Sequence, residues 1–211
     1  MDTRKTRTWA EVSLGALRHN VEEMQRALPD GCGLLGVVKA DAYGHGASEI
    51  AAALRECGCR YLAVACPQEA LALRQAGETM PILILGAVDA AFASDMAAND
   101  ITLSVECAEK GRALSAALRG GKRLRIHLKL DTGMGRLGFR VQDETALREA
   151  AAVAQLPNLD AEGVFTHFSV SDTPGEEEYT AAQLALFLSA VERLEAMTGR
   201  RFPLRHCANS G

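Results

Sequence analysis

The stretch VVKADAYGHG, residues 37–46, places a lysine directly after an apolar run. Lysine is among the side chains least often buried. Lys39 therefore either takes part in chemistry or extends its amine to solvent. Desolvation disfavours the charged form of an amine, and an uncharged lysine can form a Schiff base with a carbonyl. Tyr43 and His45 follow on a glycine-bearing loop, where catalytic groups are common. Lys39 is therefore a candidate catalytic residue, and a solvated surface lysine is the alternative.

A second polar set lies in RLRIHLKLDTGMGRLGF, residues 123–139. The alternation predicts a strand in which Arg125, His127 and Lys129 share one face and apolar residues share the other. If the apolar face meets helices, the polar face has to be paired or hydrogen-bonded inside the protein. Arg136, on the glycine-rich loop that follows, is a cation suited to an anionic group of a substrate. A half-exposed edge strand with solvated charges is the alternative.

Two further apolar runs end in polar residues. His167 comes near the end of AEGVFTHF, where a histidine is either a hydrogen-bonded core residue or a catalytic group. The last run ends in HCANSG, with Asn209 and Ser210 in a turn of small residues. Free N–H groups and a hydroxyl in such a turn suit a phosphate, and an ordinary turn is the alternative.

Short β-rich runs alternate with helical patterns along the whole chain. Alanine, leucine and glutamate dominate the helical patterns, and glycines such as Gly77 and Gly199 stop them. Ser48 is the expected cap of the helix that ends at Gly58. Seven runs are expected strands: 33–38, 61–65, 81–86, 101–105, 123–130, 161–168 and 203–210. Strands alternating with helices predict a parallel α/β protein.

Two architectures fit this alternation, a (β/α)8 TIM-type barrel and an open doubly wound sheet. The polar residues follow the first, fifth, sixth and seventh strands, and groups at so many strand ends converge only if the sheet closes. An open sheet would gather them at one switch point, so we expect the barrel. A barrel needs eight strands and about 250 residues. The chain has 211 residues and seven expected strands, so we expect a barrel truncated after the seventh, at the amino-terminal end of a longer protein.

Composition and charge restrict the kind of partner. The chain is 48% hydrophobic with a formal net charge of −4, which gives no electrostatic basis for binding nucleic acid or an anionic membrane. No apolar run approaches the roughly 20 residues of a membrane span, and the start lacks the apolar core of a signal peptide, so we expect a cytoplasmic protein. The six cysteines fit reduced thiols, and their spacing predicts no metal site.

As a set, these segments resemble the alanine racemase family, whose enzymes depend on pyridoxal 5'-phosphate (PLP). VVKADAYGHG is similar to the family's cofactor-lysine signature, and KLDTGMGRLGF, GVFTHFS and HCANS match further family segments in order. TWAEVSLGALRHNV matches the family's opening, so the resemblance covers essentially the whole chain. It implies a racemase that interconverts L-alanine and D-alanine through a carbanion stabilised by the cofactor, supplying D-alanine for peptidoglycan.

The resemblance also implies what lies outside this chain. Residues 1–211 would be an incomplete PLP-binding barrel domain, and the end of the barrel and a carboxy-terminal β domain would follow. The full protein would be a homodimer. The family's second base, a tyrosine of the partner subunit, and the arginine at the pyridine nitrogen would both lie beyond residue 211. The chain alone would therefore not racemise alanine.

Roles for individual residues follow from the same resemblance. Lys39 would hold PLP and exchange the Cα proton on one face, and Tyr43 would lie against the cofactor. Arg136 would contact the PLP phenolic oxygen and the substrate carboxylate. Lys129 would be carbamylated, and its carbamate would position Arg136. The other implied cofactor contacts are His167 under the pyridine ring and, at the phosphate, Asn209 and Ser210.

Three other functions compete with alanine racemisation. The chain could belong to a serine or broad-specificity racemase of the same family, because residues of the missing domain largely set substrate size. A non-catalytic PLP-binding barrel protein would keep the lysine, but it is not expected to share the DTGMGRLG and HCANS segments. A PLP decarboxylase of the same barrel class is disfavoured by the close match around Lys39.

Overall fold

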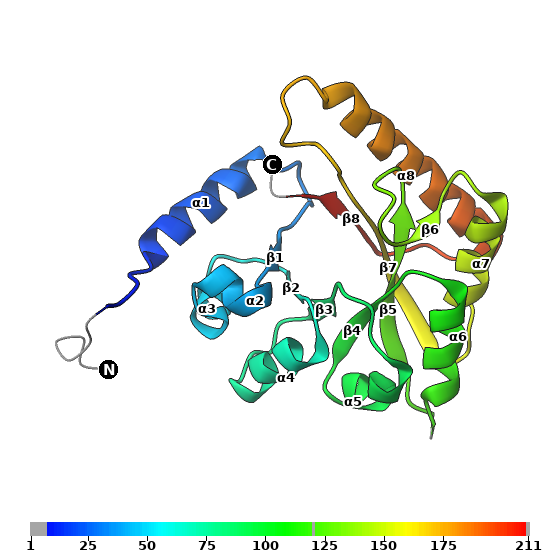
Figure 1. The fold of residues 1–211 in the computed structure, drawn as a ribbon, viewed down its shortest axis with the longest axis horizontal. Coiled ribbons are helices and arrows are strands. Elements are labelled where there is room, and N and C mark those ends of the chain that lie inside the picture. The colour runs from blue at the N-terminus through cyan, green and yellow to red at the C-terminus, as the bar shows by residue number, and fades with distance from the viewer. Residues whose placement is uncertain (1–7, 120, 210–211) are drawn as a thin grey trace.

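The computed structural model describes residues 8–119 and 121–209, which form a curved sheet with helices along its outer side (Figure 1). The strands follow the order β1-β2-β3-β4-β5-β7-β8, every neighbouring pair is parallel, and the short β6 pairs with β5. This order runs along the sequence without a reversal, as in a barrel and unlike a doubly wound sheet. β1 and β8 lie at the two edges, so the described residues form an incomplete barrel and confirm the expected architecture.

All seven expected strands are present, with ends that differ by at most two residues from the sequence prediction. They are β1 (Leu35–Val37), β2 (Tyr61–Val64), β3 (Ile82–Ile84), β4 (Ile101–Val105), β5 (Leu124–Asp131), β7 (Leu159–His167) and β8 (Leu204–Ala208). The sequence does not predict β6 (Phe139–Arg140), because two residues are too few to show a period-two pattern.

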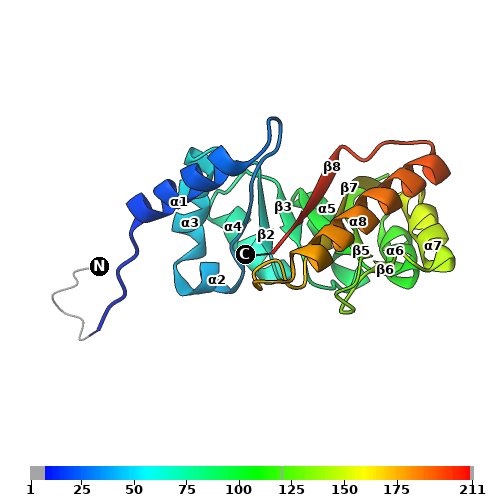
Figure 2. The same cartoon turned by 90° about the horizontal axis from the view of Figure 1, so that it is seen from above.

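The helices between these strands are amphipathic or short. They are α1 (Leu14–Ala27), α2 (Lys39–Gly44), α3 (Ala47–Glu56), α4 (Pro67–Gln75), the 3-10 turn η2 (Ala90–Phe92), α5 (Ala93–Ala98), α6 (Ala108–Ala117), α7 (Glu144–Ala154) and α8 (Glu177–Thr198). None of the described helices is long and apolar enough to cross a membrane. Seen from above, α7 and α8 lie side by side at one end of the molecule and α1 lies at the other (Figure 2).

One expected helix cap is wrong. α3 begins at Ala47, with Gly46 as its cap, so Ser48 lies inside the helix. The carboxylate of Asp41 accepts a hydrogen bond of 2.7 Å from the Ala47 N–H and supplies the acceptor that Ser48 was expected to provide. The cap therefore comes from the turn before the helix, which a local serine pattern cannot reveal.

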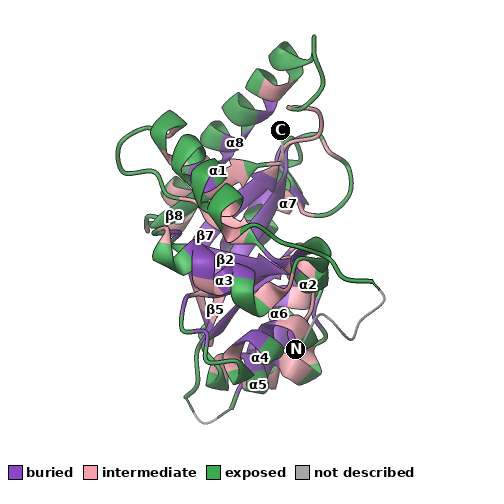
Figure 3. Cartoon of the chain, turned by 90° about the vertical axis from the view of Figure 1, so that its left-hand side faces the viewer, coloured by how far each residue is buried: buried purple, intermediate pink, exposed green. Residues whose placement is uncertain are grey.

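The main hydrophobic core lies between the sheet and the helices. Residues such as Leu62, Ile84 and Leu103 are fully buried there, and Figure 3 shows the strands as the buried centre of the molecule. A second, smaller cluster of Tyr61, Ala63 and Leu83 lies on the opposite face of the sheet. The inner face of β2 and β3 is therefore largely apolar, with the Tyr61 hydroxyl as its polar group, and the charged residues of the barrel interior come from later strands.

Candidate functional site

Lys39 is followed directly by a turn of left-handed helix. Ala40, Asp41, Ala42 and Tyr43 have φ between 51° and 55° and ψ between 36° and 49°. None of the four is glycine, and a left-handed conformation disfavours each such residue by roughly 1–2 kcal/mol. Backbone strain of this kind persists only where the surroundings determine it, and it concentrates at functional sites. The conformational free energy of the backbone after β1 is thus unfavourable. The turn starts at Ala40, the residue after the candidate catalytic lysine.

Hydrogen bonds close the carboxyl end of the turn. The Gly46 N–H donates to the Asp41 carbonyl oxygen over 2.9 Å, and the Ala42 carbonyl accepts from the backbone N–H of His45 over 3.1 Å. Nδ1 of His45 lies 2.9 Å from the same carbonyl. The residue His45, singled out in the sequence, therefore contributes to this turn through both its backbone and its ring. Lys39 Nζ lies 5.9 Å from the centre of the Tyr43 ring, which is 60% exposed.

Lys129 lies buried on the inner face of β5, as the alternation predicts. Only 7% of the residue is exposed, Nζ donates to the Leu130 carbonyl oxygen over 2.8 Å, and the ring of Phe165 lies 5.5 Å away. Burial lowers the pKa of Lys129 to about 8, with Arg136 lowering it further and Asp131 opposing the shift. At neutral pH a measurable fraction of this amine is uncharged and therefore nucleophilic.

The loop after β5 carries Arg136 and is held by an aspartate. One carboxylate oxygen of Asp131 accepts hydrogen bonds of 3.0 Å from the N–H groups of Gly133 and Gly135. The chain then returns to β5, because Gly138 has φ 121° and its α-carbon packs against the β5 backbone. A Cβ at Gly138 would lie 2.8 Å from the Lys129 carbonyl oxygen. The glycines of this segment therefore allow the loop conformation in which the Arg136 side chain is exposed.

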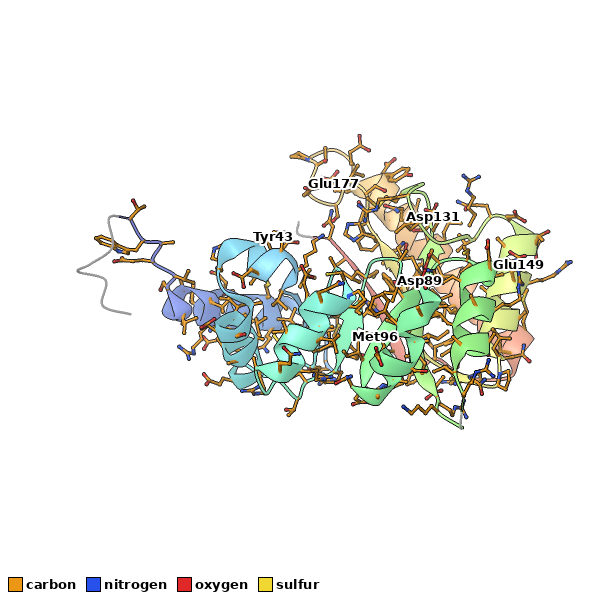
Figure 4. The ribbon with its side chains drawn as sticks, turned by 60° about the horizontal axis from the view of Figure 1, so that its bottom comes forward. Tyr43, Asp89, Met96, Asp131, Glu149 and Glu177 are labelled. Atoms are coloured by element: carbon orange, nitrogen blue, oxygen red, sulfur yellow. The ribbon has the colours of Figure 1, made fainter. Side chains whose placement is uncertain are left out.

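His167, at the end of β7, joins these groups into one site. Burial is the largest cause that lowers the pKa of His167, and three cations lower it further: Arg136, Lys129 and Lys39. The cations act on His167 from the ends of β1 and β5, so the strand ends converge as the barrel prediction requires. In Figure 4 the labelled Tyr43 and Asp131 lie along the same rim of the sheet.

Asn209 comes directly after β8 and contacts the loop after β7. Its side-chain oxygen is hydrogen-bonded to the hydroxyl of Ser171, and its amide nitrogen lies 3.4 Å from a carboxylate oxygen of Asp172. Both of these contacts are with the loop after β7, and neither is with Lys39 or Arg136. Ser210, the other expected phosphate contact, lies outside the described residues.

The sequence prediction missed a polar network inside the barrel. Pairing of β5 with β7 shifts register after Ile126 and skips Glu162, whose carboxylate lies on the inner face. This carboxylate accepts hydrogen bonds from Tyr61 Oη over 2.8 Å and from Thr102 Oγ1 over 3.0 Å, and it lies 3.4 Å from Nε2 of His127. A glutamate inside an otherwise apolar strand was the only signal in the sequence.

His206 on β8 completes this network. Its Nε2 lies 2.8 Å from Nδ1 of His127, and its ring stacks on Phe165 with a centroid separation of 4.8 Å. Burial, followed by the nearby His127 and Lys129, lowers the pKa of His206 to about 3. Burial raises the pKa of Glu162, but the nearby His127 ring and a hydrogen bond from Tyr61 outweigh it, so that the carboxyl has a lowered pKa. The interior thus contains an ionised carboxylate and a neutral histidine at neutral pH.

Together, the strand order and the amine at a strand end define an incomplete α/β barrel with a cationic site at its rim. The similar proteins named below are racemases. The family model described as "Alanine racemase, N-terminal domain" matches residues 12–211. The alanine racemase of Desulforamulus reducens is 42% identical over 203 residues, which are 96% of this chain and 54% of that protein.

Solved structures agree. The alanine racemase of Clostridium difficile 630 in complex with cycloserine matches with a TM-score of 0.91 and 36% identity, over 98% of this chain and 56% of that one. A histidine racemase from Leuconostoc mesenteroides matches with a TM-score of 0.78 and 31% identity, over 94% and 52%. The chain belongs to the alanine racemase family, and it spans about half the length of the relatives it matches.

The loop that carries Arg136 gives a first test. Gly138→Ala places a methyl group 2.8 Å from a backbone oxygen and 2.9 Å from the Asp131 backbone nitrogen, so it should lower the free energy of unfolding by about 3 kcal/mol. Gly135→Ala is the matched control, because Gly135 also has a positive φ of 71° but has no atom within 4 Å of the added methyl. The control should lose only about 1 kcal/mol in urea denaturation. Equal losses would show that close packing against β5 is unimportant.

The pKa of His206 gives a second test. The unfolded chain takes up this proton near pH 6.5 and the folded chain only near pH 3. The stabilisation from neutral His206 is therefore complete above pH 6.5 and is lost as the pH falls toward 3, by up to about 1.4 kcal/mol per pH unit. Between pH 7 and 5, His206→Gln should show a smaller fall in the free energy of unfolding than the wild type, measured with urea. An unchanged fall would mean that His206 titrates normally in the folded chain.

Proposed function

We propose that this chain is the PLP-binding barrel part of an amino-acid racemase that acts on alanine. One observation carries the proposal. The Lys39 amine lies at the same rim as the cations of Lys129 and Arg136, close enough that all three lower the pKa of His167. An amine that can attack a carbonyl, surrounded by fixed positive charge, suits a ligand that combines an aldehyde with anionic groups.

The residues present fit PLP, which carries an aldehyde, a phenolic oxygen and a phosphate. Among residues 8–119 and 121–209, neither Lys39 nor Lys129 nor Arg136 forms an ion pair. The nearest carboxylate on the β5 loop, Asp131, has one oxygen occupied by two backbone N–H groups. The rim therefore has more positive than negative charge, and anions of the cofactor and the substrate would balance it. When bound, PLP would supply the electron sink for the charge left at the substrate Cα.

This chain's own residues would bind the cofactor and move a proton. Lys39 would hold PLP through Nζ, and the same amine would take or return the substrate Cα proton on one face. Arg136 would hold the substrate carboxylate and contact the phenolic oxygen, and Tyr43 would cover the lysine side. His167, kept neutral by its lowered pKa, would face the pyridine ring as a polar neighbour without adding charge. Asn209 and Ser210 would lie at the phosphate.

Lys129 would carry a carbamate. An amine with a pKa near 8 is partly uncharged at neutral pH, which is the form that reacts with carbon dioxide. The carbamate would turn a buried cation beside Arg136 into an anion that pairs with the guanidinium. Coulombic repulsion between the two cations, one of the causes that lower the Lys129 pKa, supports this assignment.

Racemisation needs proton exchange on both faces of a planar carbanion, and Lys39 serves one. The opposite base, the pyridine-nitrogen partner and the dimer contacts would lie beyond residue 211, so this chain alone should not racemise alanine. The relatives named above support alanine as the substrate, and the structural match to a histidine racemase keeps other amino acids as the alternative. In a cell the protein would act in the cytoplasm as a homodimer and supply D-alanine for peptidoglycan.

Borohydride reduction after mixing with PLP tests the proposal. A reduced pyridoxyl adduct should appear on Lys39 in peptide mass spectrometry, and Lys39→Ala should remove it. Lys122→Ala, which removes an exposed lysine on another loop, is the control and should leave the adduct in place. An adduct mainly on Lys129 or on surface lysines, or one that persists in Lys39→Ala, would refute the assignment.

A further inference from the structure

A glutamate outside the rim site contacts the backbone next to Lys39. Glu69 lies in the first turn of α4, with one carboxylate oxygen 2.8 Å from the Ala40 backbone N–H and the other 2.7 Å from the Ala65 N–H. Ala40 is the first residue of the left-handed turn and the neighbour of Lys39. We infer that Glu69 is a positioning residue for Lys39. The inference rests on the proposed function only in assuming that the Lys39 amine binds PLP.

The pairing of β1 with β2 explains why the carboxylate is needed. The strands are in register with Val37 opposite Ala63, and the last ladder hydrogen bond runs from the Val38 N–H to the Ala63 carbonyl oxygen over 2.8 Å. In a continued parallel ladder, the Ala65 N–H would donate to Val38, and the Ala40 N–H would donate to Ala65. Both of those bonds are lost where the chain turns left-handed.

The Val38 carbonyl is redirected into the turn. It accepts from the Ala42 N–H over 3.0 Å, which leaves the N–H groups of Ala40 and Ala65 without backbone acceptors. Glu69 supplies one carboxylate oxygen to each. A single side chain thus replaces two consecutive ladder bonds and ties the end of β1 to the end of β2, on the strand side of the strained turn.

Packing alone leaves the turn weakly held. Of the four left-handed residues only Ala42 is buried, and a pocket between α2, α3 and α4 lies behind the turn. Val38, Asp41, Ser48 and Glu69 are among the residues that line it. With little apolar contact behind it, the turn depends on its hydrogen bonds for its position.

An ordinary helix-capping role does not account for both contacts. A glutamate in the first turn of a helix interacts favourably with the helix dipole and can reach back to a preceding N–H, as Glu69 does to Ala65. The bond to Ala40 adds nothing to α4. Glu49 is a suitable comparison, because it is the third residue of α3 as Glu69 is the third residue of α4. Among the described hydrogen bonds, the turn contacts the start of α3 through Asp41 and not through Glu49. Of these two glutamates, Glu69 is the one with described hydrogen bonds both to the turn and to the end of β2.

Glu69→Gln separates positioning from capping in the 211-residue chain. The amide keeps one acceptor oxygen and faces the other N–H with its own donor, so only one of the two bonds survives. The rate constant for PLP attachment to Lys39, measured by absorbance and borohydride trapping, should fall about tenfold or more, since small displacements of a reacting group have large kinetic effects. Glu49→Gln should stay within about twofold of the wild type.

Amide hydrogen exchange supplies a readout that does not depend on PLP. Glu69→Gln should raise the exchange rate at Ala40 or Ala65, or both, while the exchange rates of amides inside α4 stay near wild-type values. Unchanged exchange at both sites with unchanged trapping would overturn the inference. Loss of protection throughout α4 with normal trapping would also overturn it, because Glu69 would then be only a cap.

If the variant does not fold, an NMR measurement on the wild-type chain tests the same contact. A scalar coupling across the hydrogen bond between the Ala40 amide nitrogen and the Glu69 carboxyl carbon should be observable by NMR, and its absence would refute the contact. If the wild type forms no Lys39 adduct while this coupling is present, the proposed function fails and the structural role of Glu69 stands. The two failures are therefore distinguishable.

Discussion

The left-handed turn that begins after Lys39 is the constraint on which the site depends. Four consecutive residues without glycine adopt a conformation that disfavours each by roughly 1–2 kcal/mol, so neighbouring groups must hold them there. Asp41 does so at one end by starting α3, and Glu69 does so at the other by joining β1 to β2. A right-handed continuation would direct the chain after Lys39 along another path and would remove both contacts.

The two halves of the sheet contribute differently to the barrel interior. β2 and β3 present Tyr61, Ala63 and Leu83 to the inside, and apart from the Tyr61 hydroxyl the polar groups of the network come from β4, β5, β7 and β8. Burial on this inner face lowers the pKa of Lys129 and of His206, while hydrogen bonds keep Glu162 ionised. The charges at the rim thus belong to residues that the fold itself brings together, in keeping with membership of the alanine racemase family.

Much of the fold could be predicted from the sequence, because strand alternation and helix-stopping glycines are local signals. The strands that carry Lys39, Lys129 and His167 could also be predicted, because their apolar runs end in polar residues, and the roles of these residues in the site stay a prediction. The cap of α3 could not, because Asp41 reaches Ala47 from the preceding turn. The partners of Glu162 could not either, because Tyr61 and Thr102 reach it from strands that are distant in the sequence. The left-handed conformation of residues 40–43 could not be predicted, because none of these residues is glycine.

A crystal structure of this chain grown with PLP is the most direct test of the central claim, that the turn after Lys39 presents its amine to an anionic carbonyl compound at the barrel rim. The account predicts continuous electron density from Lys39 Nζ to the cofactor, positive φ at residues 40–43 and a Glu69 carboxylate between the Ala40 and Ala65 N–H groups. Density for PLP on another lysine, or a right-handed turn with PLP bound, would contradict it.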